Sequence, residues 1–319
     1  RDLHSFPTRR SSDLRQKGWG PDTFGTYAAS EYIVNVFGFL IIAGVILDKM
    51  GVRFTGVLSA SMMFIGALIK FIGITDWFAQ TALADWLNSW WVTLPASAKM
   101  ACFGFMLFGC GCEMAGTTVS KAIAKWFKGK EMALAMGLEM AIARVGVFAI
   151  FSISPIIADH FGTVVAPVAF CTVLLLIGLI TFIVFTFMDK ALDKQMGVTE
   201  EAADPEEEFK FSDLGKIFSS QVFWIVALLC VLYYSAIFPF QRYGANMLQC
   251  NLDGISAEAA SNIFRWFPIG AAVITPFLGN FLDRKGKGAT MLMGGALLLI
   301  CCHLVFAFVL PAKIGRAHV

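Results

Sequence analysis

The sequence predicts an all-α integral membrane protein built from two related helical bundles. Of its 319 residues, 57% are hydrophobic and only 15% are charged, and the mean hydropathy is +0.70. A soluble domain needs a charged surface that this composition cannot supply, whereas helices solvated by a bilayer do not need one. A ten-residue phrase occurs twice, each time at the end of an apolar stretch, and indicates that one membrane half was duplicated.

Eight largely apolar segments are long enough to cross a membrane. An α-helix needs about 20 residues to cross the ~30 Å hydrocarbon layer, and helices are required because unpaired backbone amides cannot face lipid. The segments are uniformly apolar rather than alternating, which argues against spanning strands. The predicted spans are 24–47, 54–75, 101–119, 132–158, 163–188, 221–240, 264–282 and 289–310.

Basic residues in the connecting loops predict the orientation. Lys and Arg are enriched in cytoplasmic loops. Thirteen of them lie on one side of the predicted topology, and two, Lys99 and Arg242, lie on the other. We therefore expect a multi-pass protein of the plasma membrane (the inner membrane of a bacterium) with both copies of the repeated phrase in the cytoplasm. The first predicted span begins outside, so a further helix is expected before it.

The repeated phrase reads G-x-x-x-D-[KR]-x-G and adds a basic residue beyond its last glycine. Its first copy runs from Gly44 to Arg53 and its second from Gly279 to Gly288. Compact loops at two-fold-related positions would meet at the cytoplasmic midline, which favours a gating role over a simple topogenic turn. The expected gating residues are Gly44, Asp48, Lys49, Gly51, Arg53, Gly279, Asp283, Arg284 and Gly286.

Composition divides the chain into five parts. Residues 1–14 and 313–319 resemble translated sequencing adapters, and we expect them to be non-native tails. Residues 15–188 are expected to form the first bundle, without its first helix, and residues 221–312 part of the second. Residues 189–220 contain the acidic, proline-punctuated run TEEAADPEEE and are expected to be a cytoplasmic linker.

Together these features resemble the major facilitator superfamily. The resemblance rests on the two turns at matching positions, the long central loop and the basic connection KWFKGKE at 125–131. It implies a fold of two six-helix bundles with inverted repeats, of which this chain covers about eight helices, from the second to the ninth. It also implies that the Asp and basic residues of the turns pair across the inner gate. The second copy departs from the pattern, because its basic residues are shifted and multiplied.

A closer similarity is to the branch of this family that contains the lysosomal dipeptide uniporter. It rests on YYSAIFPF at 233–240 and RWFPIG at 265–270. That branch places a Glu on helix four and an Arg on helix five at the substrate cavity, which correspond to Glu113 and Arg144. Ionisable side chains inside spans cost at least ~2.5–3.5 kcal/mol to insert. Glu113 and Arg144 would bind the amine and the carboxylate of a zwitterion, or else pair with each other and lock two helices together.

Further polar residues are candidates for the cavity or for proton transfer. Glu31 is a candidate proton carrier, although a water-exposed vestibule position would equally explain it. Glu139 is a second candidate, with a pairing to Lys121 or Lys125 near the inner surface as the alternative. Three residues in the outer half of the seventh helix are expected to contact the solute: Tyr233, Tyr234 and Arg242.

The sequence thus predicts a secondary transporter that moves a small polar or zwitterionic organic solute, such as a dipeptide or an amino-acid-like molecule, by alternating access. The alternatives are a proton-coupled symporter or antiporter of another metabolite and a non-transporting membrane sensor or scaffold. No HExxH, GxSxG, P-loop or CxxC motif occurs, so we expect no enzymatic activity, metal or cofactor. The expected partners are the solute, the lipid bilayer and, in the first alternative, protons. No nucleic acid is expected, and the protein is expected to be a monomer.

Overall fold

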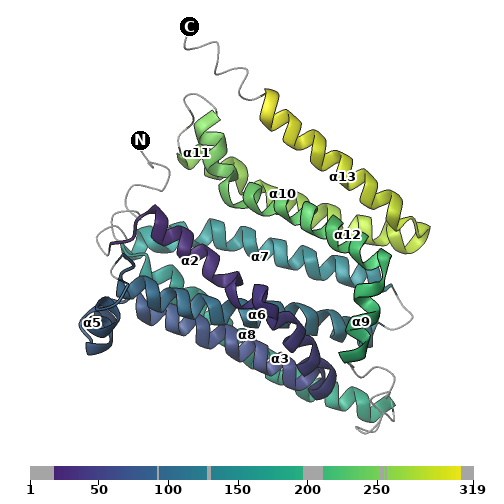
Figure 1. Ribbon diagram of the computed structural model, residues 1–319, viewed down its shortest axis with the longest axis horizontal. Coiled ribbons are helices and arrows are strands. Elements are labelled where there is room, and N and C mark those ends of the chain that lie inside the picture. The colour runs from purple at the N-terminus through teal and green to yellow at the C-terminus, as the bar shows by residue number, and fades with distance from the viewer. Residues whose placement is uncertain are drawn as a thin grey trace. The chain divides into compact units, whose positions relative to one another are not determined.

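The computed structural model describes residues 18–91, 93–127, 131–196, 211–251, 255 and 257–309, and its regular elements are all helical (Figure 1). This confirms the predicted all-α class. The predicted tails and the acidic run at 199–208 lie outside the described residues. The elements are α2 (Pro21–Val34), η1 (Asn35–Phe39), α3 (Leu40–Gly73), α4 (Asp76–Ala79), α5 (Ala82–Asn88), α6 (Ala96–Trp126), α7 (Met132–Phe161), α8 (Val165–Met196), α9 (Phe211–Ser219), α10 (Gln221–Asn251), α11 (Ala257–Phe264), α12 (Trp266–Lys285), α13 (Gly288–Leu304) and η2 (Val305–Val309).

Six stretches of the described chain are long and apolar enough to cross a membrane. The first, Asp22–Gly73, has 52 residues, about 78 Å of helix at 1.5 Å per residue and more than twice the thickness of the hydrocarbon layer. It contains two of the predicted spans, and Gly51 interrupts it with a φ of +73°. The helix α12 lies where a span was predicted but is not among the six. The other five are Ala96–Trp126, Met132–Phe161, Val165–Gln195, Gln221–Gln241 and Gly288–Phe308.

The end of α8 differs from the prediction. The sequence places the start of the linker at residue 189, yet α8 continues to Met196. Asp189 is buried, with 2% of its surface exposed, because it faces basic side chains of α3 and α6. A carboxylate that finds such partners extends the helix, whereas in the sequence alone it is indistinguishable from the polar linker that follows.

The described residues form two compact units. The N-terminal unit lies within residues 9–126 and 154–209, and the C-terminal unit lies within residues 127–153 and 210–319. The helix α7 contributes to both. Its first part, up to Ile153, belongs with the C-terminal helices, although the sequence assigns all of it to the first bundle.

Glycines bring α3 and α6 into close contact in the N-terminal unit. A Cβ placed on Gly104 would lie 2.5 Å from the carbonyl oxygen of Gly66, and the reverse substitution would give the same distance. A Cβ on Gly111 would lie 2.7 Å from the oxygen of Ser59. Since helices in lipid associate by close packing rather than by a hydrophobic driving force, these glycines set the spacing of the two helices.

We predict that Gly104→Ala destabilises the protein by about 1–3 kcal/mol, the usual cost of overpacking a well-packed site. The added methyl group would meet a backbone oxygen, which cannot turn away as a side chain can. Thermal unfolding in detergent measures the loss. Gly178→Ala in α8 is the matched control, because no atom lies within 4 Å of its Cβ position. Equal melting temperatures for the two variants would contradict the prediction.

Candidate functional site

The predicted turns are present in both copies of the repeated phrase. The glycine three residues after the Asp of each copy has a positive φ, +73° at Gly51 and +63° at Gly286, a conformation that residues with a side chain rarely adopt. Gly286 ends α12 as a left-handed cap, and its N–H donates to the oxygen of Leu282 at 2.8 Å. Both turns therefore depend on glycine at the same position of the phrase.

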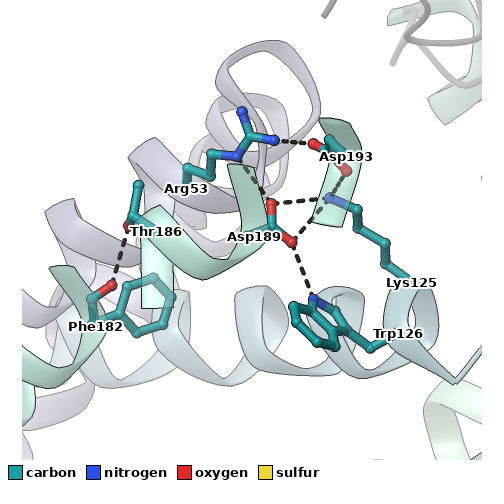
Figure 2. A network of polar contacts seen from close by, with 7 residues as sticks. All are labelled: Arg53, Lys125, Trp126, Phe182, Thr186, Asp189 and Asp193. Atoms are coloured by element: carbon teal, nitrogen blue, oxygen red, sulfur yellow. Dashed lines mark hydrogen bonds and ion pairs between the residues drawn. The ribbon is translucent and has the colours of Figure 1, made fainter. Parts of the chain in front are cut away.

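The basic residue that ends the first copy is bound by two carboxylates of α8 (Figure 2). Arg53 Nε donates to Asp189 Oδ2 at 2.9 Å, and its Nη2 forms an ion pair with Asp193. Lys125 Nζ lies 2.9 Å from Asp189 Oδ2 and 2.7 Å from Asp193 Oδ1, and Trp126 Nε1 donates to Asp189 Oδ1 at 3.0 Å. These five residues form what we call the Asp189 cluster. It joins α3, α6 and α8 at one end of the N-terminal unit.

The first copy therefore pairs within its own unit. Asp48 accepts from Lys121 Nζ at 2.7 Å, and Arg53 binds the carboxylates of α8. The family resemblance implies pairing across the gate, and that pairing stays a prediction. The turn pairs within its own unit because α6 and α8 present charges opposite to those of the turn from directly neighbouring helices. Lys49 is exposed.

The second copy contacts the beginning of α7. Asp283 Oδ2 accepts from the backbone N–H of Leu134 at 3.0 Å, in the first turn, where helix amides lack partners within their own helix. The carboxylate also complements the positive end of the helix dipole. A Cβ on Gly279 would lie 2.8 Å from the oxygen of Ala133, so this glycine allows the close approach. Arg284 is exposed and bonds Asn280 of its own helix at 3.1 Å.

Two further contacts join α7 and α12 within the C-terminal unit. The Cβ position of Gly137 lies 3.4 Å from Pro276 Cα, and the rings of Phe148 and Trp266 lie 5.8 Å apart between centroids. Arg144 lies seven residues after Gly137 and four before Phe148, which places it on the same face of α7. We call this contact the α7–α12 seam.

Glu113 lies on α6 between a glycine that packs against a neighbouring helix and a glycine with empty space beside it. One turn before it, Gly109 packs directly against the backbone of Glu31, and a Cβ there would lie 3.1 Å from Glu31 Cγ. Close to Glu113 on the other side, Gly116 has no atom within 4 Å of its Cβ position, and Thr117 is exposed. The glycines of α6 thus serve two purposes, since some admit a neighbouring helix and Gly116 leaves space.

Glu113 belongs to the N-terminal unit and Arg144 to the C-terminal unit, so their joint contact with one solute stays a prediction. Each is partly buried. Within the described part of the chain, neither side chain makes a hydrogen bond or an ion pair.

The sequence did not predict a break in the first span, next to Glu31. The helix α2 ends at Val34 and gives way to the π-helical segment η1, in which Gly38 has a φ of +96°. Asn35 Nδ2 donates to the oxygen of Glu31 at 3.4 Å, while its Oδ1 is buried without a hydrogen-bond partner among the described residues. Such breaks occur in membrane helices where the backbone lines a cavity or is buried in protein. The signal in the sequence was a glycine three residues after an asparagine in an apolar span.

The other residues predicted to contact the solute or to carry protons lie on α10 and α7. Tyr233 and Tyr234 are half-exposed on α10, with their rings 5.8 Å apart, and Tyr234 stacks on Phe238 at 5.1 Å. The side chain of Arg242 lies outside the described residues. Glu139 is partly buried on α7, and the two lysines considered as its partners are bound to Asp48 and to the α8 carboxylates. Among the described residues, no group of three or more His, Cys, Asp or Glu could hold a metal ion.

We predict that Asp189→Asn lowers the free energy of unfolding by about 3 kcal/mol or more, the usual effect of breaking a buried ion pair. The substitution leaves Arg53 and Lys125 short of one negative charge. The loss should exceed that of Asp193→Asn, because Asp193 is more exposed (15% against 2%). Thermal unfolding in detergent tests this, with the exposed Lys190→Gln as control. Equal losses for the two aspartates would contradict a central role for Asp189.

Comparisons with known proteins agree with this architecture. The model of the Major Facilitator Superfamily matches residues 11–315. The lysosomal dipeptide transporter MFSD1 of Homo sapiens is 25% identical over 299 residues, covering 89% of this chain and 57% of the relative. The Gallus gallus protein of that name is 27% identical over 253 residues (75% and 56%), and the Bos taurus protein is 26% identical over 301 residues (90% and 57%).

The chain spans little more than half of the length of these relatives. No solved structure matches it significantly. The family model covers nearly the whole chain, and the similarity to the dipeptide-transporter branch extends over most of it, which confirms both resemblances. The chain therefore belongs to the major facilitator superfamily and is a distant relative of the lysosomal dipeptide transporters.

Proposed function

We propose that the protein is a secondary transporter that moves a small zwitterionic organic solute, a dipeptide or an amino-acid-like molecule, by alternating access of its two halves. The observation that carries the proposal is the presence of two ionisable side chains, Glu113 and Arg144, inside membrane spans without partners in the described part of the chain. The relatives described above are lysosomal dipeptide transporters, which supports this class of solute.

The charges of the solute would satisfy both side chains. A carboxylate on the solute would form charge-assisted, two-pronged hydrogen bonds with the Arg144 guanidinium, and an ammonium group would bind the Glu113 carboxylate. An unpaired charge inside a membrane costs several kcal/mol, so a solute that supplies both opposite charges binds better than one that supplies a single charge. The tyrosines of α10 and Arg242 would contact the rest of the solute.

Gating would use the repeated turns. In the first copy, the Asp189 cluster and the pair Asp48–Lys121 tie the turn to α6 and α8, so that it moves as one body with its unit. In the second copy, the bond from Asp283 to the amide of Leu134 joins two helices of the C-terminal unit, and it would break and form again if the start of α7 moved against α12 within that unit. We further propose that both turns lie on the cytoplasmic side of a plasma membrane, as the loop charges indicate.

A proton-coupled mechanism is a second candidate. It is favoured by the position of Glu31 next to the broken helix at η1, since half-helix ends and released carbonyls are typical of coupling sites in transporters. Glu139 is the other candidate carrier. A saturable solute flux that does not depend on the pH gradient would favour uniport. A flux that increases with the pH gradient and is lost in Glu31→Gln would favour coupling to protons.

We predict that Glu113→Gln and Arg144→Gln each reduce dipeptide uptake by about tenfold or more, because each removes a charge-assisted hydrogen bond of about 1.5–3 kcal/mol. Uptake of a panel of dipeptides and amino acids into proteoliposomes measures this, with and without a pH gradient. Asp85→Asn, an exposed carboxylate in α5, is the control. Failure of the folded protein to take up any member of the panel would overturn the dipeptide assignment.

We predict that Asp283→Asn accelerates hydrogen exchange of the amides in the first turn of α7 by about fivefold. That factor corresponds to about 1 kcal/mol, the upper range for an exposed charge at a helix terminus. Exchange measured by mass spectrometry on the peptide around Leu134 tests the bond directly. Lys287→Gln removes a charge from the adjacent turn and serves as control. Unchanged exchange in Asp283→Asn would show that this bond does not hold the gate.

A further inference from the structure

Arg265 is a partly buried cation for which the proposed function provides no role. It directly precedes α12 with helical dihedral angles, φ −60° and ψ −22°. Its Nε is buried and has no hydrogen-bond partner, and the described residues offer its guanidinium no ion pair. A buried donor without an acceptor costs about 1–3 kcal/mol, and more when it is charged. A guanidinium kept in this state needs an anion from elsewhere.

The helical register places Arg265 on the face of α12 that contacts α7. It lies 18 residues before Asp283, which is five full turns at 3.6 residues per turn, so both side chains project from the same face. Gly279, which also contacts α7, lies 14 residues after Arg265, close to four turns. Trp266, the next residue, meets Phe148 of α7.

Arg144 lies on the same seam at nearly the same level. The two helices run antiparallel, since Gly137 meets Pro276 and, further along α7, Phe148 meets Trp266. Arg144 is four residues from Phe148, which is about 6 Å along the helix axis. The seam thus carries two arginines whose backbone positions differ by about one helical turn along the helix axes, from opposite helices of one compact unit.

We propose that Arg265 and Arg144 together bind the carboxylate end of the solute, and that Arg265 is a specificity-determining residue for solutes with a second carboxylate. The inference rests on the proposed function for the identity of the solute. Its chemistry is general, because guanidinium groups bind carboxylates through two parallel hydrogen bonds. With two cations at this end, an acidic dipeptide such as alanyl-glutamate should bind more tightly than a neutral one.

The test is the binding of three radiolabelled peptides to the protein in lipid nanodiscs: alanyl-glutamate, alanyl-alanine and alanyl-alanine amide. We expect Arg265→Gln to lower the binding affinity for alanyl-glutamate by about 10-fold or more, which is the effect of losing one charge-assisted hydrogen bond. Binding of the amide, which lacks a carboxylate, should not change. Arg265→Lys should restore part of the affinity. The control is Lys285→Gln, an exposed charge at the far end of the same helix.

The outcomes separate this inference from the proposed function. If dipeptides bind and Arg265→Gln leaves all three affinities unchanged, or lowers all three equally together with the melting temperature, the role of Arg265 is overturned while the transporter proposal stands. If no peptide binds, a second experiment decides whether Arg265 forms an anion site at all. In it, Arg265 is labelled with phenylglyoxal and the labelling is mapped by mass spectrometry. Protection by succinate would support an anion site for a different solute, and absence of protection would overturn the site as well.

Discussion

A single buried carboxylate organises one end of the N-terminal unit. Asp189 is reached by an arginine from α3 and by a lysine and an indole from α6, so three helices that are distant in sequence meet at one pair of oxygens. Because unpaired charge is costly in a low-dielectric interior, such a group fixes the positions of its partners. The first repeated turn begins the helix segment that carries Arg53, and its position therefore depends on this contact.

The same unit is fixed at its other end by a different polar residue. Lys99 is buried, and its Nζ donates to the carbonyl oxygens of Leu87 and Trp90. The same Nζ lies 4.8 Å from the centroid of the Trp90 ring, which makes a cation–π contact. Trp19 Nε1 donates to Ser97 at 2.9 Å. Between the two ends, the glycine contacts bring α3 and α6 close together. Polar contacts at both ends and close helix packing between them thus hold this unit together.

Spans and turns could be predicted from the sequence because they depend on local properties, namely the length of an apolar stretch and a glycine at a strained position. Two features could not. The extension of α8 through Asp189 depends on partners that lie 64 and 136 residues away in the chain, and nothing in the local composition distinguishes it from the linker. The break at Gly38 follows the turn of α2 in which Glu31 packs on Gly109, a contact between distant parts of the sequence that local composition does not reveal. Glu113 and Arg144 could be selected because an ionisable residue in a span is rare, but their surroundings could not be predicted.

The two turns differ in their partners. Each copy has an Asp and, three residues later, a glycine with positive φ, but in the first copy the Asp meets a lysine and in the second it meets a helix amide. An exposed ion pair between neighbouring helices and a bond from a carboxylate to a helix N-terminus are each worth about 1 kcal/mol or less. The charges of the chain are accordingly divided between two uses. Those of the Asp189 cluster compensate one another, and those of Glu113, Arg144 and Arg265 have no counterpart in the described residues. A solute that supplies the missing charges would stabilise the folded protein in proportion to its binding. On this view, the same ion pairs would recognise the solute and neutralise the unpaired charges inside the membrane.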